Sequence, residues 1–96
     1  MVIRVLDSVP AADTGAQGAI IRDMIASAMR SGSTASVSFA GINTATSSFV
    51  NVCFVDLLAH YTLDDIKRKV KIINSTSQIN DMIKGRLIQA ASLEAA

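Results

Sequence analysis

The chain of 96 residues has no Trp, one Cys, one His and one Pro, and only 18% of its residues are charged. A single cysteine cannot form an internal disulfide, and Cys53 with His60 alone cannot build a Cys/His zinc site, so we expect no metal. Hydrophobic residues make up 50% of the chain, which excludes a disordered protein. The net charge of +1 creates no strong field toward nucleic acid, so we expect no nucleic-acid partner.

Charge is missing altogether from residues 31–55, which contain no Asp, Glu, Lys or Arg. Such a run suggests a membrane span, but Ser, Thr and Asn interrupt it, and no apolar stretch of about 20 residues lies inside it. The N-terminus has no apolar segment of the length that a signal peptide requires, since Arg4 is followed by Asp7 and Pro10. We expect a cytoplasmic protein without membrane contact.

Sequence periodicity predicts three strands that alternate with three helices. Residues 1–6 are rich in β-branched side chains and stop at a turn-forming segment, which is typical of a strand. Thr14 and Gln17 match a capping box, and apolar residues at helical spacing follow as far as Gly32. Residues 34–39 alternate small polar and apolar side chains and predict the second strand.

The second half of the chain continues the alternation. The second helix is predicted from one apolar stripe, formed by Val50, Cys53, Phe54, Leu57, Leu58 and Tyr61. Residues 62–65 match a capping box that opens a short helical turn, and residues 70–73 predict the third strand. Ser75 with Gln78 is expected to cap the last helix, and residues 92–96 are expected to fray.

This order favours a single domain over residues 1–96, a small α/β sandwich with a mostly parallel sheet packed by about three helices (β-α-β-α-β-α). The helical connections are long enough for parallel crossovers, which places residues 34–39 in the interior of the sheet. Because Ser and Ala replace large residues there, we expect this strand to be closely covered on both faces. Function is expected at its carboxyl end, where α/β folds usually bind ligands.

The loop at this carboxyl end, residues 41–49, is rich in hydroxyl groups. Thr46, Ser47 and Ser48 precede the second helix, where unpaired backbone N–H groups need an acceptor. One interpretation is that such a hydroxyl caps the helix. The other is phosphorylation or anion binding, because the helix dipole and the free N–H groups stabilise negative charge.

Residues 36–51 resemble the bacterial STAS-like domain family, together with Thr14, Gly15 and Arg22 before them and Asn74 with the following helix after them. The resemblance extends over residues 13–87 and rests mainly on the Ser48-Phe49 helix start after a Phe39-x-Gly41-Ile42 strand end. STAS domains are the fold of anti-sigma-factor antagonists, in which a strand leads through an Asp-Ser-Ser-Gly turn to a helix. In that family the first Ser of the turn is phosphorylated by a partner-switch kinase.

Two of the four residues of this turn agree with the family. The resemblance places Thr46 at the Asp position, Ser47 at the phosphorylated Ser, Ser48 at the second Ser and Phe49 at the Gly. The change to Thr46 removes a carboxylate, and Phe49 is large where the antagonists keep a small residue for the partner to approach. Phosphorylation of Ser47 is the hypothesis that the resemblance implies.

Other candidate groups are interpreted as structural. Cys53 lies in the apolar stripe and is expected to be a buried hydrophobe rather than a nucleophile. His60 ends the second helix, where a cation is favourable, and is expected on the surface. The basic cluster within residues 67–71 is interpreted as a solvated rim, the alternative being a contact for an acidic partner or phosphates. Gly15 and Gly18 match a phosphate-binding loop only faintly.

No set of acid, base or metal groups converges in the sequence, so we expect no catalysis and no cofactor. We expect a regulatory module that resembles STAS-like regulators and binds a protein partner through residues 41–48 and the exposed face of the helix after them. The residues expected at this surface are Thr46, Ser47, Ser48 and Asn51, with further ligand or partner contacts from Asn43, Thr44 and Arg22.

The resemblance implies a kinase-like ATPase, an anti-sigma-type regulator or another host complex as the partner. Two alternatives stay open. The first is a module that senses a small anion or a nucleotide at the same helix start. The second is a protein of a mobile element, such as a phage, that inhibits a host complex including defence machinery. The apolar composition also leaves a homodimer open.

Overall fold

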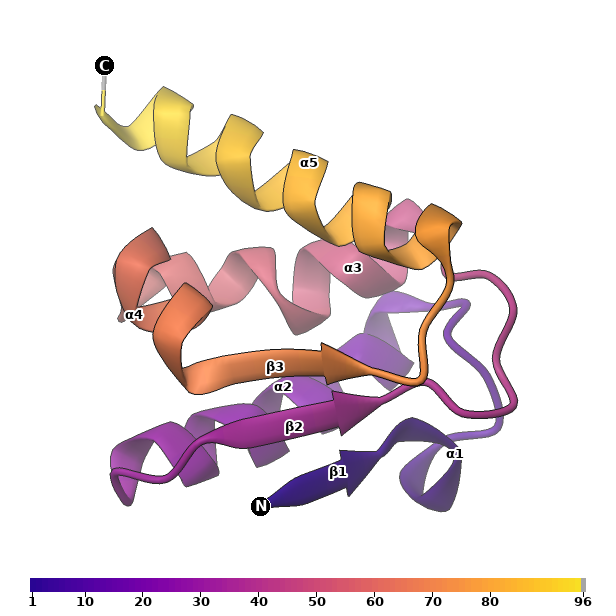
Figure 1. Ribbon diagram of the computed structural model, residues 1–96. Coiled ribbons are helices and arrows are strands. Elements are labelled where there is room, and N and C mark those ends of the chain that lie inside the picture. Colours follow the sequence, from indigo (N-terminus) through magenta and orange to yellow (C-terminus); the bar gives the residue numbers. More distant parts are fainter. Residues whose placement is uncertain (96) are drawn as a thin grey trace.

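The computed structural model describes residues 1–95, with side-chain surroundings as far as residue 92. Within this range the predicted alternation of strands and helices is confirmed, with short helical segments added between them (Figure 1). The elements are β1 (Val2–Arg4), α1 (Val5–Ser8), α2 (Gly15–Arg30), β2 (Ala35–Ser38), α3 (Ser47–Cys53), the 3-10 helix η1 (Val55–Ala59), α4 (Leu63–Lys69), β3 (Val70–Ile73) and α5 (Ser77–Ala95).

The sheet is parallel throughout and has the strand order β1-β2-β3, so β2 is central, as the crossover argument predicts. Side chains alternate between its two faces. Ile3, Val37 and Val70 point to the helices and are buried. The protein is therefore a small α/β fold whose core lies between one face of the sheet and the helices.

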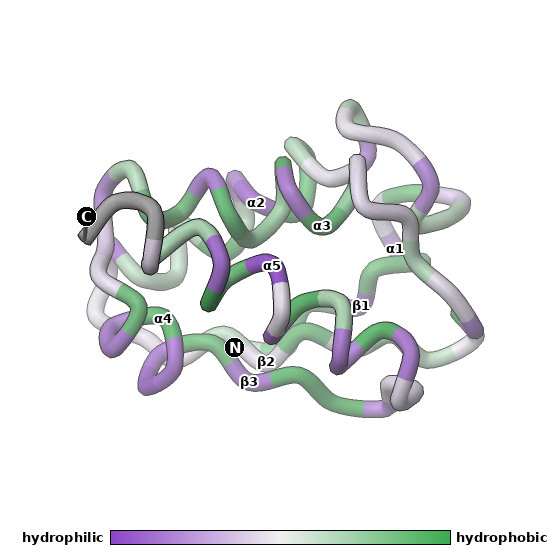
Figure 2. The backbone as a smooth tube through the Cα atoms, turned by 90° about the horizontal axis from the view of Figure 1, so that it is seen from above, coloured by the Kyte–Doolittle hydropathy of each residue, from purple (hydrophilic) through white to green (hydrophobic). Residues whose placement is uncertain are grey.

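Over residues 1–95 the helices pack on this face alone. On the outer side of β2, where close cover was predicted, Ser38 is buried and Ser36 is half-buried, with no helix over them. Figures 1 and 2 show α2, α3 and α5 on the same side of the sheet. The strand order explains this, because right-handed crossovers between sequential parallel strands put every connecting helix on one side. On the other face Val2 is 62% exposed and Ile73 is 37% exposed.

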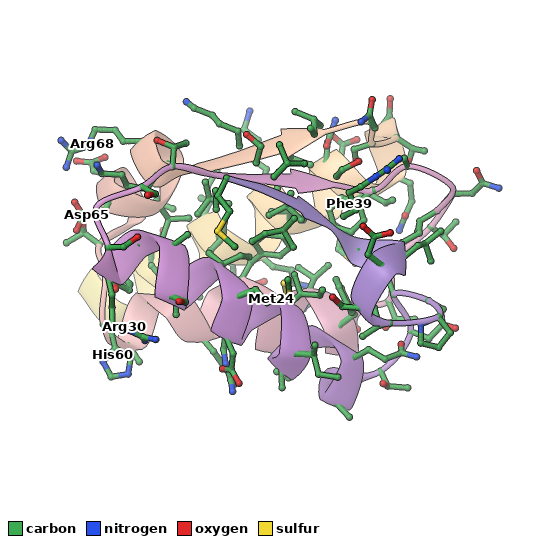
Figure 3. The ribbon with its side chains drawn as sticks, turned by 90° about the horizontal axis from the view of Figure 1, so that it is seen from below. Met24, Arg30, Phe39, His60, Asp65 and Arg68 are labelled. Atoms are coloured by element: carbon green, nitrogen blue, oxygen red, sulfur yellow. The ribbon has the colours of Figure 1, made fainter. Side chains whose placement is uncertain are left out.

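An aromatic group at the carboxyl end of β2 forms the centre of the core. Phe39 follows β2 directly and is fully buried, and Figure 3 shows it beside the ends of the strands. Its ring packs edge to face on Phe49, at 6.3 Å between ring centroids, and lies 6.4 Å from the ring of Phe54. Because Phe49 belongs to α3 and Phe54 follows it, Phe39 fixes α3 against the sheet.

α2 and α3 pack closely because glycines line the start of α2. A Cβ atom on Gly18 would lie only 2.6 Å from the carbonyl oxygen of Phe49 and 3.2 Å from the backbone nitrogen of Cys53. A Cβ atom on Gly15 would lie 3.1 Å from Cγ2 of Val52. These glycines therefore serve helix packing, which accounts for their position near a helix start.

The first strand is shorter than the predicted range 1–6, because the chain turns into α1 after Arg4. The N–H group of Val9 donates to the carbonyl oxygen of Val5 at 3.0 Å and closes a single helical turn. The Val5 side chain is completely buried in this conformation. Burial thus overrides the β propensity of a β-branched residue here.

The second predicted helix is broken at Phe54. α3 ends at Cys53, and in the 3-10 segment that follows, the N–H of Leu57 donates to the carbonyl of Phe54 at 3.1 Å. Val50 and Leu57 are both buried, so the apolar stripe faces the core on either side of the break. A spacing of three residues fits both kinds of turn, and the stripe alone does not distinguish them.

The two capping boxes predicted from local sequence are confirmed. Thr14 and Gln17 cap α2, and Thr62 and Asp65 cap α4, each through reciprocal side-chain and backbone hydrogen bonds. The hydrogen bond from the backbone of Thr62 holds the pKa of Asp65 below its usual value. Arg68, which donates to Asp65 at 2.8 Å, acts in the same direction (Figure 3).

The predicted cap of the last helix is wrong, because Thr76 and not Ser75 caps α5. Oγ1 of Thr76 accepts a hydrogen bond from the N–H of Ile79 at 3.3 Å. Gln78 does not complete a capping box, since its carboxamide is bound to Ala45 in the loop before α3.

α5 buries Ile79, Ile83 and Leu87 in the core. The helix continues through Ser92 to Ala95, and residue 96 of the predicted frayed tail lies outside the described residues. Over residues 1–95, none of the helices is both long enough and apolar enough to span a membrane.

Candidate functional site

The loop of residues 41–48 lies at the carboxyl edge of the sheet, beside the starts of α2, α3 and α5 (Figure 1). It begins with a turn in which the N–H of Ile42 donates to the carbonyl of Phe39 at 2.9 Å. Gly41, the third residue of this turn, has a φ of 83°. A type II turn requires a positive φ at this position, which explains the glycine.

Residues of the β3–α5 connection and of the first turn of α5 hold one side of the loop. The Gln78 carboxamide binds the backbone of Ala45 twice: its Nε2 donates to the carbonyl at 3.3 Å, and its Oε1 accepts from the N–H at 3.2 Å. Oγ1 of Thr76 donates to the carbonyl of Asn43 at 3.1 Å. The backbone of the loop is thereby tied to α5.

The connection between α1 and α2 holds the other side. The N–H of Thr46 donates to the carbonyl of Ala12 at 3.0 Å, and its Oγ1 donates to the carbonyl of Asp13 at 2.6 Å. The side chains of Asn43 and Thr44 are exposed between these two anchors. The loop therefore presents exposed side chains on a backbone that the protein itself holds in place.

Thr46 is the residue that caps α3. Its Oγ1 accepts a hydrogen bond from the N–H of Phe49 at 3.2 Å while donating to Asp13. The hydroxyl is thus engaged inside the protein in both directions. Of the three candidate hydroxyls, Thr46 has the capping role that one interpretation of the sequence predicts.

Ser47 and Ser48 are the first two residues of α3. Ser47 is half-buried, whereas Ser48 and Asn51 are exposed. Within the described part of the chain, the hydroxyls of Ser47 and Ser48 take no part in the side-chain hydrogen bonds that hold the loop. Neither hydroxyl is used to hold the loop, and that of Ser48 belongs to an exposed residue.

The outer face of α3 continues from this point into a shallow groove against α5. Asn51 and Val55 form one wall of the groove, and Arg86, Gln89 and Ala90 form the other. Its volume is about 160 Å³. The loop, the outer face of α3 and this groove make one continuous surface, which we call the loop–α3 surface.

Comparison with protein families matches residues 17–80 to a family described as a STAS-like domain of unknown function (DUF4325). The chain belongs to this family. Comparisons with curated proteins and with solved structures found no match.

The match covers the loop, α3 and the Gln78 anchor of this STAS-like domain, but not the anchors at Ala12 and Asp13 or the α5 wall of the groove. It runs from the first turn of α2 through β2, the loop, α3 and β3 into the first turn of α5. Both Thr46 and Gln78 lie inside it. β1, α1 and most of α5 lie outside it.

The two positions at which the STAS-like domain departs from the Asp-Ser-Ser-Gly turn now have a structural explanation. Thr46, which the resemblance places at the Asp position, caps α3, and Asp and Thr are both favoured N-cap residues. Phe49, which the resemblance places at the Gly position, is completely buried against Phe39. It lies inside the core and leaves Ser47 and Ser48 at the surface without a bulky neighbour from this position.

Arg22, the remaining predicted contact, is engaged with other residues. Its Nη1 contacts Oδ2 of Asp56 at 3.2 Å, and its Nη2 contacts Oδ1 of Asp23 at 3.1 Å. The guanidinium group links α2 to η1, whereas Asn43 and Thr44 belong to the loop. Arg22 therefore forms ion pairs with Asp23 and Asp56 and is not part of the loop–α3 surface.

A second, wider groove of about 680 Å³ lies along α2 and η1. Arg22, Arg30, Asp56, His60 and Tyr61 are among its lining residues, and Figure 3 shows Arg30 and His60 near each other at one end. His60 is exposed and ends η1, as predicted. The lining of the groove contains both cations and carboxylates, and the carboxylates of Asp23 and Asp56 already form ion pairs with Arg22.

Cys53 is fully buried, as predicted, and burial raises the pKa of its thiol well above the usual value. A protonated, buried thiol is a poor nucleophile. Among the described residues, no group of three or more His, Cys, Asp or Glu side chains is arranged to hold a metal ion.

Sequence reasoning missed the residues that hold the loop in place. Gln78 and Thr76 bind it from a segment 33 positions away in the chain, and the carbonyls of Ala12 and Asp13 bind it from the other side. A sequence pattern marks Gln78 only as the possible partner of a helix cap. Its contact with Ala45 can be predicted only when it is known which segments meet at the carboxyl edge of the sheet.

Proposed function

We propose that this STAS-like domain is a non-catalytic regulatory module that binds a protein partner through the loop–α3 surface. The observation that carries the proposal is that hydrogen bonds to neighbouring segments hold the backbone of the loop in place. Ala45 is anchored to the first turn of α5 and Thr46 to the α1–α2 connection, whereas Asn43, Thr44 and Ser48 are exposed. A surface that is ordered before binding loses little conformational entropy when a partner docks.

The family resemblance supports the kind of partner. STAS-like regulators act with kinase-like ATPases and anti-sigma-type regulators, and the resemblance places Ser47 at the phosphorylated position. The free hydroxyl of Ser47 at the start of α3 agrees with this role. We propose that a phosphate on Ser47 adds negative charge to the uncharged loop and first turn of α3 and weakens partner binding there.

Replacing Ser48 by Arg is expected to weaken binding of the partner at least tenfold, which corresponds to about 1.4 kcal/mol. The larger, charged side chain would stand on the exposed first turn of α3, in the middle of the proposed surface. Binding is measured by calorimetry with the kinase-like ATPase or anti-sigma-type regulator that the wild-type domain captures from its host.

Ser33→Arg is the matched control, because Ser33 is equally exposed but lies in the turn that follows α2, at the opposite edge of the sheet. It should bind like the wild type. Equal affinities for wild type, Ser48→Arg and Ser33→Arg would contradict the proposed surface. A thermal shift produced by a nucleotide or small anion, and lost in Ser48→Arg, would support the small-ligand alternative instead.

Phosphorylation of Ser47 is a separate expected result. Intact mass of protein purified from its host should show a phosphorylated form that disappears in Ser47→Ala and persists in Ser48→Ala. The phosphorylated form should bind the partner more weakly than the unmodified form. Absence of the modified form when the cognate kinase is present would contradict this role of Ser47 and leave the binding surface to be judged by Ser48→Arg.

A further inference from the structure

The outer face of the sheet, which the helices leave open, carries a regular pattern of side chains. Register partners form two rows of three across the strands, with a serine in the middle of each row. The rows are Val2, Ser36 and Lys71, and Arg4, Ser38 and Ile73. The two apolar side chains therefore occupy opposite corners, and the two cations occupy the other corners.

The four corner residues are all exposed. Val2 is 62% exposed, Ile73 is 37% exposed, and neither Arg4 nor Lys71 forms an ion pair within the described residues. The serine of the second row, Ser38, is buried, and its hydroxyl accepts a hydrogen bond from Nδ2 of Asn74 at 3.0 Å. Because serine is smaller than the four corner residues, the outer face is expected to form a shallow depression along β2.

An open face is unusual for a parallel sheet. Parallel sheets occur almost always with both faces covered, and their exposed apolar side chains are costly in water. Figure 3 shows side chains projecting from the strands on the side away from the helices, with none of the elements within residues 1–95 over them. The geometry indicates that another molecule completes the fold on this side.

We propose that an acidic amphipathic helix of a partner protein covers the outer face of the sheet. Strand spacing of about 4.8 Å and a rise of about 3.3 Å per residue put the Val2 and Ile73 corners roughly 12 Å apart. Two turns of an α-helix span about 11 Å, so apolar residues two turns apart would reach both corners. Carboxylates on the two flanks of that helix would then meet Arg4 and Lys71.

The charge of the outer face favours an acidic helix over a second copy of the chain. The six outward strand positions hold two cations and no carboxylate, so two such faces brought together would oppose like charges. An acidic helix supplies the missing sign at both corners. The face is separate from the loop–α3 surface, because the sheet lies between it and α3, and both surfaces can be occupied at once.

Two synthetic helical peptides test the proposal. One has Leu residues two turns apart with Glu on both flanks, and the other has Lys in place of every Glu. Each is titrated into the isotope-labelled full chain at low ionic strength and followed by NMR. The acidic peptide should bind at least tenfold more tightly, shift the amides of β1, β2 and β3, and lose its advantage as salt is added.

The double variant with Arg4→Glu and Lys71→Glu should reverse the preference between the peptides, and Lys71→Gln, a milder change, should reduce it. Ser48→Arg should leave it unchanged, which separates this surface from the one proposed above. The proposal is overturned by equal affinities, by binding of neither peptide, by shifts confined to residues 41–48, or by self-association of the chain through these strands.

Discussion

Replacement of Phe39 by Ala is expected to lower the free energy of unfolding by about 3–5 kcal/mol, which is a large part of the stability of a small domain. The side chain is completely buried and contacts the rings of Phe49 and Phe54. Its removal leaves a cavity where β2, α3 and the segment after α3 meet. The measurement is urea denaturation followed by far-ultraviolet circular dichroism, since the chain has no Trp.

Two further variants calibrate this result. Phe39→Leu keeps most of the volume and should cost clearly less, and it provides a folded protein if the alanine variant is too unstable to study. Val2→Ala changes an exposed strand residue and should cost less than about 1 kcal/mol. A loss below about 1 kcal/mol for Phe39→Ala would contradict the position of Phe39 at the centre of the core.

Replacement of Gly18 by Ala is expected to destabilise the protein by about 1–3 kcal/mol, although alanine favours helix formation. The new Cβ atom would lie 2.6 Å from the carbonyl oxygen of Phe49, and this neighbour is backbone that cannot rotate away. α2 and α3 would have to move apart. The shift would also move the first turn of α3, where Ser47 and Ser48 lie.

Gly85→Ala is the matched control for this prediction. Gly85 is an exposed glycine inside α5, and a Cβ atom there would meet nothing within 4 Å. The same substitution should therefore stabilise the protein by up to about 1 kcal/mol through helix propensity alone. Two substitutions of opposite sign support helix contact as the role of Gly18. If Gly18→Ala also stabilised the protein, the close approach of α2 and α3 would be contradicted.

The features that could be predicted from the sequence are those with local causes. The capping boxes at Thr14 and Thr62 form between residues three positions apart, so a short pattern suffices to find them. The central place of β2 follows from the length of the helical connections on either side of it. The buried stripes follow from helical spacing.

The features that could not be predicted depend on contacts between distant segments. Gln78 has the spacing of a cap partner, but the loop at Ala45 competes for its carboxamide and wins. Residues 1–6 have the composition of a strand, but burial of Val5 favours a helical turn. The open face of the sheet follows from the strand order, which puts all connecting helices on one side. The small side chains of β2 do not predict the strand order and so do not predict the open face.

The candidate site shows the same division. The sequence places the hydroxyls of Thr46, Ser47 and Ser48 at a helix start, and the structure confirms that position and assigns the cap to Thr46. It also places Arg22 in an ion pair with Asp56. Whether Ser47 and Ser48 meet a partner depends on a second molecule, and this stays a prediction.

Two surfaces of this STAS-like domain are open, and they face different directions. The loop–α3 surface is polar and hydroxyl-rich, with Ser48 and Asn51 exposed on it. The outer face of the sheet is cationic and apolar, with Arg4 and Ile73 among its corners. Under the two proposals, the domain would hold one protein through the sheet while it exchanges another at α3.

Amide hydrogen exchange of the domain, free and bound to its captured partner, tests the proposed function most directly. The account predicts that exchange slows mainly in residues 41–48 and in α3, beyond the protection that the hydrogen bonds of the loop already provide in the free protein. The Ser48→Arg variant should lose this added protection. Slowed exchange that leaves residues 41–48 and α3 unchanged, and falls only on other segments, would contradict the account.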